Sequence, residues 1–172
     1  MNSVMENLLT RRSVRAFEKK EIPADELDQI LQAALYAPSG MGRQTWQFTV
    51  VTDREKIQKL AAVVKKELNR PGYDMYAPEV IIIPSNERDN RFGKEDNACA
   101  LENIFLAAHS LGIGSVWINQ LRGICDKPEI RAILREWKIP DDHVIYGLAA
   151  LGYAASEPSQ DVEKRGIVNI IE

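Results

Sequence analysis

The sequence has few residues that could form a metal centre. Its 172 residues include 2 Cys and 2 His. Cys99 and Cys125 are too far apart for a CxxC motif, and His109 and His143 are likewise separated. A structural zinc site needs four such ligands, so we expect no metal. Both cysteines are expected to be free thiols, as in a reducing compartment.

The common signatures of nucleotide binding and nucleophilic catalysis are also missing. No G-x-G-x-x-G motif follows a predicted strand, and neither a Walker phosphate loop nor a G-x-S-x-G elbow is present. The two histidines lack an obvious catalytic triad. The sequence therefore gives no indication of a Rossmann dinucleotide site, a P-loop or an α/β-hydrolase site.

Long apolar runs and an excess of positive charge are absent as well. No segment approaches the ~20 apolar residues of a membrane span, and the first residues lack a signal-peptide pattern. The net charge is -3, whereas nucleic-acid-binding domains carry a strongly basic face. We expect a cytoplasmic protein that binds neither membranes nor nucleic acid. Its length suits one domain, taken as residues 1–172.

Hydrophobic periodicity predicts an α+β fold in which helices flank a central mixed, largely antiparallel sheet. Ser3 and Glu6 have the spacing of a capping box at the first helix, and Thr52 is expected to open the third. The predicted helices are residues 3–9, 23–37, 52–68, 96–111 and 126–137, and the predicted strands are residues 46–52, 80–83, 115–118, 144–151 and 166–171.

The last predicted strand, residues 166–171, needs a sheet edge to join. An isolated strand leaves its backbone N–H and C=O groups unpaired. The edge can belong to the same chain or to a partner, and the sequence leaves this open. The segment favours a homodimer that exchanges its C-terminal strand. The helix at residues 96–111, rich in small and apolar residues, is expected at the dimer interface.

Three segments have a composition suited to binding a ligand. Residues 11–15, R-R-S-V-R, contain three guanidiniums and a hydroxyl that can grip a phosphate. If this stretch is extended, Arg12 points away from its neighbours. Residues 37–46 contain glycines and a proline that let the backbone approach a flat ligand closely. Residues 163–165 place a basic pair before the final strand.

Each segment also has an ordinary explanation. The arginines can form a solvated basic segment that pairs with Glu18 or Glu21. Residues 37–46 can be a connector between a helix and a strand, which needs turn residues. The basic pair at residues 164–165 can belong to a solvated linker. Taken singly, none of the three segments decides between these alternatives.

Taken in order, these segments resemble the nitroreductase family over nearly the whole chain. Family members look like R-R-S-x-R, then A-P-S-x-x-N-x-Q-P-W, G-x-G-S-x-W-I, L-G-Y and a basic pair. The corresponding segments are residues 11–15, 37–46, 112–118, 151–153 and 164–165. Each motif is weak by itself, but their order and spacing are fairly specific.

The resemblance implies FMN bound in a groove between the two subunits of a homodimer. The FMN phosphate would be held by Arg11, Lys164 and Arg165. The ribityl chain and the pyrimidine edge of the flavin would lie against Arg12, Ser13 and Arg15. A cation at the pyrimidine edge, the role of Arg15, stabilises the negative charge that builds up on the reduced flavin.

Two further groups of residues are assigned to the flavin by the same resemblance. The other subunit would cover part of the cofactor with Pro38, Ser39 and Gly40. A backbone N–H near flavin N5 would come from the stretch Trp117, Ile118, Asn119 and Gln120.

The activity implied is an oxidoreductase that uses NADH or NADPH to reduce small electrophilic acceptors, such as nitroaromatics or quinones. No catalytic side chain is needed, because flavin N5 carries the hydride. Without a Rossmann site, the nicotinamide would leave the flavin face before the acceptor enters, so ping-pong kinetics are expected. Two alternatives stay open: a flavin-handling protein with little reductase activity, and a small α/β module that recognises an anionic partner.

The sequence departs from the family pattern near this flavin site. Gly42 stands where the family usually has Asn, and Thr45 where it usually has Pro. These changes are expected to affect the preference for substrate more than flavin binding. The loop at residues 69–78 is short, which is expected to leave the site open.

Overall fold

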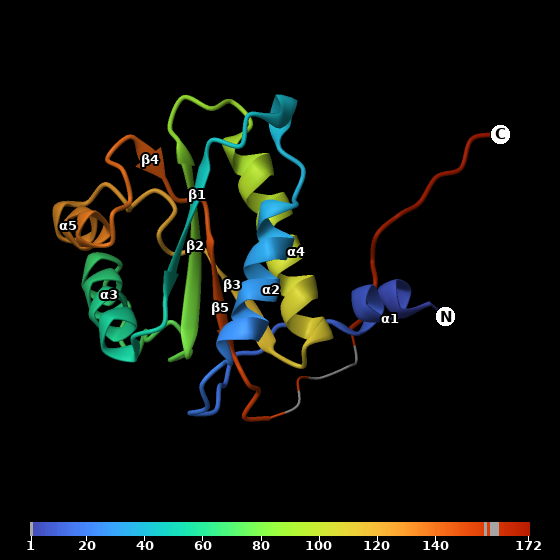
Figure 1. Cartoon of the computed structure of the whole chain (residues 1–172), viewed down its shortest axis with the longest axis horizontal. Coiled ribbons are helices and arrows are strands. Elements are labelled where there is room, and N and C mark those ends of the chain that lie inside the picture. The colour runs from blue at the N-terminus through green and yellow to red at the C-terminus, as the bar shows by residue number, and fades with distance from the viewer. Residues whose placement is uncertain (1, 157, 159–161) are drawn as a thin grey trace.

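The computed structural model describes residues 2–156, 158 and 162–172, and its centre is a five-stranded sheet between two layers of helices (Figure 1). The sheet order is β1-β2-β5-β3, and β4 also pairs with β2. β1 and β3 are therefore the edges. The strands are β1 (Trp46–Val51), β2 (Val80–Glu87), β3 (Gly114–Ile118), β4 (His143–Val144) and β5 (Leu148–Gly152).

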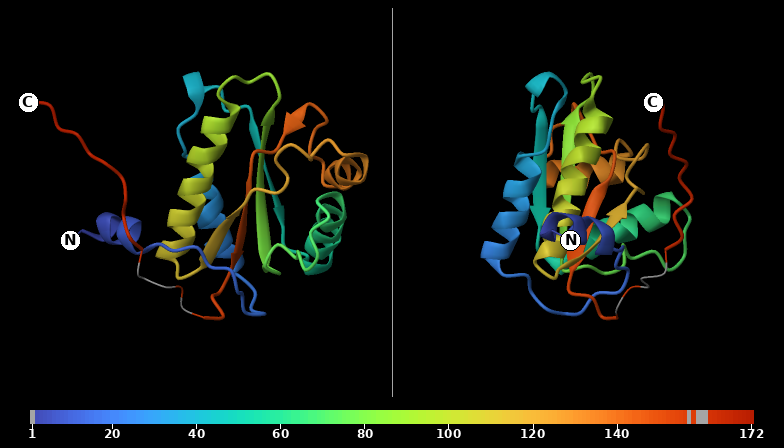
Figure 2. Two further views of the ribbon diagram at one scale, coloured as in Figure 1. Left: turned by 180° about the vertical axis from the view of Figure 1, so that it is seen from behind. Right: turned by 90° about the vertical axis from the view of Figure 1, so that its right-hand side faces the viewer.

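Helices cover both faces of the sheet. Helices α2 and α4 lie on one face, and α3 and α5 on the other (Figure 1). A short 3-10 turn, η1, connects α2 to β1. Figure 2 shows α1 projecting from the α4 side, away from α3 and α5. The bounds are α1 (Ser3–Thr10), α2 (Ala24–Leu35), η1 (Gly40–Gly42), α3 (Arg54–Glu67), α4 (Gly93–Ser110) and α5 (Pro128–Glu136).

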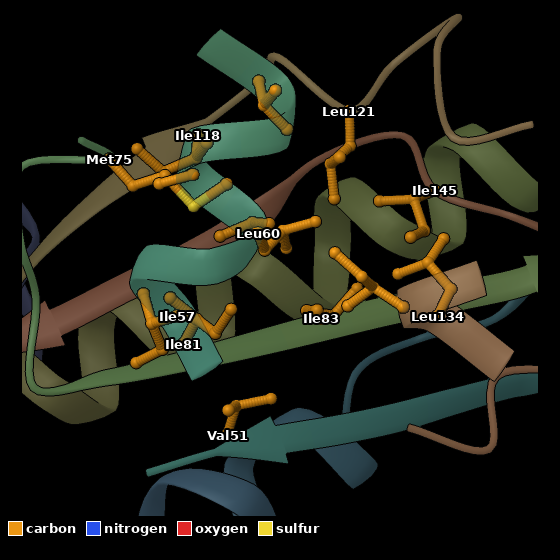
Figure 3. Close-up of a cluster of buried hydrophobic side chains, with 14 of the residues drawn as sticks. Val51, Ile57, Leu60, Met75, Ile81, Ile83, Ile118, Leu121, Leu134 and Ile145 are labelled. Atoms are coloured by element: carbon orange, nitrogen blue, oxygen red, sulfur yellow. The ribbon is translucent and has the colours of Figure 1, made fainter. Parts of the chain in front are cut away.

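The apolar run at the start of β2 is buried on both faces, as its lack of alternation predicts. Ile81 and Ile83 point into the core under α3 and α5, together with Ile57 and Leu60 (Figure 3). Ile82, on the opposite face, belongs to the core under α2 and α4. Successive side chains of a strand alternate between faces, so one strand contributes to two cores.

Two predicted helix starts were wrong by one residue. Asn2, rather than Ser3, caps α1, because its side chain accepts the Met5 N–H at 2.9 Å. Asp53, rather than Thr52, caps α3 and accepts two backbone N–H groups. Asn and Asp are at least as good as Ser and Thr at satisfying the first free N–H groups of a helix.

Three predicted strand features also need correction. β2 continues to Glu87, well past the predicted end, because its polar residues still pair with β1 and β4. The predicted strand at residues 144–151 is two strands, β4 and β5, which are separated near Gly147. The Trp117 indole packs against the backbone there, because a Cβ on Gly147 would lie 2.5 Å from its Nε1. The four strand ladders described are all antiparallel, not mixed.

The two ends of the chain lie outside the core layers. Residues 11–17 are extended and touch the sheet through isolated bridges, Ser13 with Ser115 and Phe17 with Ala154. The tail from residue 162 onward runs away from the sheet and forms no strand with the described part of the chain (Figure 1). Its last apolar residue, Ile171, is 96% exposed. No helix in the described part is long and apolar enough to cross a membrane.

Candidate functional site

A basic cavity lies where the arginine segment meets the C-terminal tail. Its volume is about 330 Å³. The described residues that line it include four cations, one hydroxyl and no carboxylate. Such a donor set is suited to an anion, and guanidiniums can grip a phosphate in bidentate fashion. The lining residues are Arg11, Arg12, Ser13, Arg15, Pro158, Val162 and Lys164.

Arg12 lies at this cavity with its neighbours, contrary to the expectation that it points away. Its Nη1 donates to the Leu9 and Arg11 carbonyl oxygens, both at 2.8 Å. The side chain therefore folds back onto the end of α1, where helix carbonyls lack partners within the helix. Simple alternation failed because a long side chain can curl around the backbone of its own segment.

The other two arginines follow the surface alternative only in part, because Arg15 is exposed and Arg11 is half-buried. Among the described residues, neither Arg11 nor Arg15 forms an ion pair with Glu18 or Glu21. Both residues line the cavity. The structure therefore brings together the arginines that the sequence predicts to act together.

The basic pair near the C-terminus is divided. Lys164 lines the cavity. Arg165 instead donates to the Glu163 carboxylate, from Nε at 2.9 Å and from Nη2 at 2.6 Å. Glu163, Lys164 and Arg165 are all exposed. Arg165 would have to leave Glu163 to reach a ligand.

Strand β3 lies beside the arginine segment because Ser13 bridges Ser115 at the sheet edge. Trp117 is 39% exposed and packs against Phe105 of α4. Ile118 is buried in the core, so only its backbone is available at the edge. The predicted flavin-facing strand and the arginines are thus neighbours in one chain.

The stretch after β3 carries a further predicted contact. The Asn119 N–H donates to the Gln120 side-chain oxygen at 3.1 Å, and the Tyr73 hydroxyl donates to the same oxygen at 3.4 Å. The loop at residues 69–78 therefore packs against this stretch through Tyr73. Burial raises the pKa of Tyr73 well above its usual value, which keeps the hydroxyl a donor.

The third predicted group, Pro38, Ser39 and Gly40, lies far from the arginines. Gly40 is bonded to Asp96 near the start of α4, whereas Thr10 is bonded to His109 near its end. Asp96 and His109 are thirteen positions apart in α4, which corresponds to about 20 Å at 1.5 Å per residue. One chain alone does not bring its own loop to its own arginine cavity.

His109 connects α4 to the end of α1. Its Nε2 lies 2.8 Å from the Thr10 hydroxyl, which itself donates to the Glu6 carbonyl oxygen. The imidazole Nε2 must therefore be the donor to Thr10. Burial lowers the pKa of His109, and the positive charges of Arg11 and Arg12 lower it further. The sequence pattern around His109 does not indicate this contact.

A buried polar network behind the 38–45 loop was also missed. It includes Asn86, Asn90 and Asp96, of which Asn86 is 1% and Asp96 2% exposed. In the sequence these residues look like ordinary turn and helix-start residues. Only their burial in the folded chain distinguishes them.

The fold is an antiparallel sheet covered by helices on both faces, with a basic cavity at one edge. The sequence profile of the Nitroreductase family matches residues 8–153. The chain belongs to this family, which confirms the predicted α+β fold of a central antiparallel sheet flanked by helices. The predicted class of FMN-dependent NAD(P)H oxidoreductase is confirmed too, whereas the exchange of the C-terminal strand stays a prediction.

Individual relatives agree with this assignment. A crystal structure of a nitroreductase with bound FMN from Bacteroides fragilis superposes with a TM-score of 0.94, at 41% identity, covering 100% of both chains. A putative NADH dehydrogenase/NAD(P)H nitroreductase of Methanothermobacter thermautotrophicus is 35% identical over 90% of this chain and 79% of its own length. An FMN reductase (NADPH) of Bacillus subtilis is 26% identical over 91% of this chain and 68% of its own length.

Proposed function

We propose that this protein is an FMN-dependent oxidoreductase that uses NADH or NADPH to reduce small electrophilic acceptors such as nitroaromatics or quinones. The basic cavity carries the proposal, because a chain with net charge -3 concentrates four cations there. FMN offers a phosphate that matches this charge. The FMN bound in the Bacteroides fragilis relative and the name of the Bacillus subtilis relative support the choice.

The residues present fit the cofactor. Arg11 and Lys164 would neutralise the phosphate, and Arg165 would join them on leaving Glu163. Ser13, which also lines the cavity, would bond the ribityl chain through its hydroxyl. The cavity adjoins β3, so a flat ring leaving it along the sheet edge would meet the stretch that begins at Trp117.

The chemistry would come from the cofactor, and the chain would supply position and electric field. FMN, when bound, supplies two-electron redox chemistry between NAD(P)H and the acceptor. Arg12 and Arg15 would place positive charge at the pyrimidine edge, where reduction adds negative charge, and so favour reduction. No described side chain is needed as a nucleophile. Both substrates would use the same open face in turn, which gives ping-pong kinetics and parallel initial-rate lines.

A second copy of this chain would complete the site. Helix α1 has no buried residue, and its apolar side chains Val4 and Leu9 are 65% and 50% exposed. Exposed apolar surface that gathers on one element marks an interaction site. The 38–40 loop, about 20 Å from its own arginines, would then reach the cavity of the partner.

The C-terminal tail would be exchanged in this dimer. A groove of about 420 Å³ lies between α2 and the edge strand β1, lined mainly by apolar residues. β1 has a free edge in the described structure, and an extended apolar segment can add to such an edge as a strand. Residues 166–171 of the partner would fill it. The groove residues are Leu31, Leu35, Gln44, Trp46, Phe48 and Val50.

The test is the visible spectrum of the protein after it is loaded with FMN and desalted. Flavin bands at about one per chain, with NADH oxidation that depends on an added acceptor, would support the proposal. Flavin retention without acceptor-dependent oxidation would favour a flavin-handling protein. A colourless protein would refute the proposal and favour a module for another anion.

The dimer is tested separately by sedimentation velocity at micromolar concentration. The intact chain should sediment as a dimer, and deletion of residues 166–172 should weaken the association because it removes the exchanged strand. Deletion of Glu172 alone is the control. A folded monomer from the intact chain would contradict the two-subunit site.

A further inference from the structure

The loop from Pro38 to Gln44 has a strained backbone. Met41 and Gln44 have positive φ values of 59° and 51°, which side chains other than Gly adopt rarely. Gly42, between them, has φ of 65°. Such conformations persist only where surrounding contacts hold them, and they gather at sites that bind ligands. The contacts that hold this loop are therefore informative.

One of these contacts is a buried carboxylate. The Gly40 N–H donates to Asp96 Oδ1 at 2.7 Å, and Asp96 is 2% exposed. Asp96 lies in the first turn of α4, where the helix dipole favours a negative charge. The Asn90 side-chain amide donates to the other oxygen of Asp96 at 3.3 Å. The middle of the loop is thus tied to the start of a core helix.

A second contact begins at Thr45, where the loop meets β1. The Thr45 hydroxyl donates to Asn86 Oδ1 at 2.6 Å and accepts from Asn90 Nδ2 at 2.9 Å. Both asparagines are buried. Thr45 stands where the family usually has Pro, which has no hydroxyl. This chain therefore closes the network with a bond that the usual family residue cannot make.

Packing fixes the same side of the loop. A Cβ on Gly40 would lie 2.3 Å from Cγ of Phe92, so the loop backbone rests directly on that ring. The Phe92 N–H in turn donates to Asn90 Oδ1 at 3.0 Å. On the other side, Met41 is 77% exposed. These contacts hold the inner side of the loop, and its outer side faces away from its own subunit.

We propose that Thr45 and Asp96 are positioning residues, which hold the 38–44 loop in the shape that covers the flavin of the partner subunit. The inference rests on the proposed FMN site between two subunits. A loop that is already ordered loses little conformational entropy when it closes over a ligand, so affinity is gained without a new contact. Neither residue touches the cofactor in this arrangement.

The first experiment removes the hydroxyl of Thr45 with little change of shape. Thr45→Val should raise the Kd for FMN, measured by quenching of flavin fluorescence, and the acceptor KM. The loss of one or two hydrogen bonds corresponds to about three- to tenfold. kcat should change by less than about twofold, because the cavity residues are intact. Thr45→Ser should restore wild-type values.

Thr49→Val is the matched control, because Thr49 lies on β1 and its hydroxyl accepts from Gln47 at 3.1 Å, outside the network. It should leave the Kd for FMN unchanged. Asp96→Asn is the second network variant and should raise the Kd in the same direction, since its amide would face the Asn90 donor. Thermal unfolding of Thr45→Val and Asp96→Asn is measured as well, so that the Kd values for FMN are compared between proteins that are fully folded.

The second experiment asks which site the loop serves. Hybrid dimers are made from a Thr45→Val chain and an Arg15→Ala chain carrying different tags. If the loop covers the partner's site, each hybrid has one intact site, and half of the FMN binds with wild-type affinity. If the loop acts within its own chain, both sites are damaged and no wild-type class appears, which would overturn the inference.

The outcomes separate this inference from the proposed function. A wild-type protein that retains no FMN would refute the proposed function itself. A wild-type protein that retains FMN while Thr45→Val and Asp96→Asn bind it equally well would refute only the positioning role. An increase in Kd that Thr45→Ser fails to reverse would also contradict that role.

Discussion

Val14 donates its backbone N–H to the Ser115 carbonyl oxygen at 2.9 Å, next to the bridge between Ser13 and Ser115. This single parallel contact fixes the arginine segment against the edge of β3. Because the contact uses backbone atoms, it orients the side chains of residues 11–15 without consuming their charge. The same backbone contact therefore positions the cavity residues relative to β3, the strand proposed to face the flavin.

The arginines of the cavity should contribute separately to FMN binding. Arg12→Ala and Arg15→Ala are each expected to weaken binding by ~2 kcal/mol, because each would remove charge-assisted hydrogen bonds. The Kd from flavin fluorescence measures the effect. Lys65→Ala, which removes an exposed cation from α3, is the control. Normal flavin content and normal rates in both arginine variants would show that the site is assigned wrongly.

Close packing at Gly114 should also matter for the cofactor. A Cβ there would lie 2.8 Å from Val14 Cγ2, so Gly114→Ala must push the arginine segment off the strand. We expect a loss of ~1–3 kcal/mol in the free energy of unfolding, together with weaker FMN binding. Chemical denaturation and FMN titration measure the two.

Asp126 should stabilise the fold through a buried guanidinium. Its Oδ1 accepts from Arg131 Nη2 at 2.6 Å, and Arg131 is 5% exposed. Hydrogen bonds from Arg88 and then from Arg131 lower the pKa of Asp126. Asp126→Asn should cost ~1–3 kcal/mol of unfolding free energy, because it leaves a buried charge less well paired.

The exposed pair of Arg135 and Asp141 offers a matched control for that measurement. Its Nε–Oδ1 distance is 2.7 Å, but both side chains are 61% exposed. Asp141→Asn should therefore lower the free energy of unfolding much less than Asp126→Asn does, because solvent screens an exposed ion pair. Equal losses in Asp126→Asn and Asp141→Asn would show that burial of Arg131 is not what matters.

His109 should make the stability of the protein depend on pH. Burial, Arg11 and Arg12 lower its pKa below the usual 6.5, so below pH 6.5 the unfolded chain binds more protons than the folded one. The contribution of His109 is fully present above pH 6.5 and is lost as pH falls through the lower pKa of the folded state.

Urea unfolding of the wild type and His109→Gln between about pH 5 and pH 8 measures this dependence. Gln can still donate to Thr10 but does not titrate, so the variant should lose less stability on acidification. Identical pH profiles for the two proteins would contradict the assignment. Inorganic phosphate in the cavity should reduce the difference, because it offsets the charge of the two arginines.

Patterns local in the sequence predicted the helices and strands well. The 3.6-residue repeat identified the helices, and the β-branched run at residues 80–83 identified the central strand. The errors in the strands came at points where a residue distant in the sequence decides. β5 begins after Gly147 because Trp117 packs against that backbone, and β2 continues because β1 and β4 pair with its polar end.

The sequence by itself determined the family, and it predicts the segments of the site and an anionic ligand, because these depend on residue types at fixed spacings. Tertiary structure alone decided how the segments are placed. It brought Arg12 back to the cavity, turned Arg165 to Glu163, and buried Asp96 behind the 38–44 loop. It also placed that loop and the arginines at opposite ends of α4, since a helix fixes distance in a way that a spacing in the sequence does not reveal.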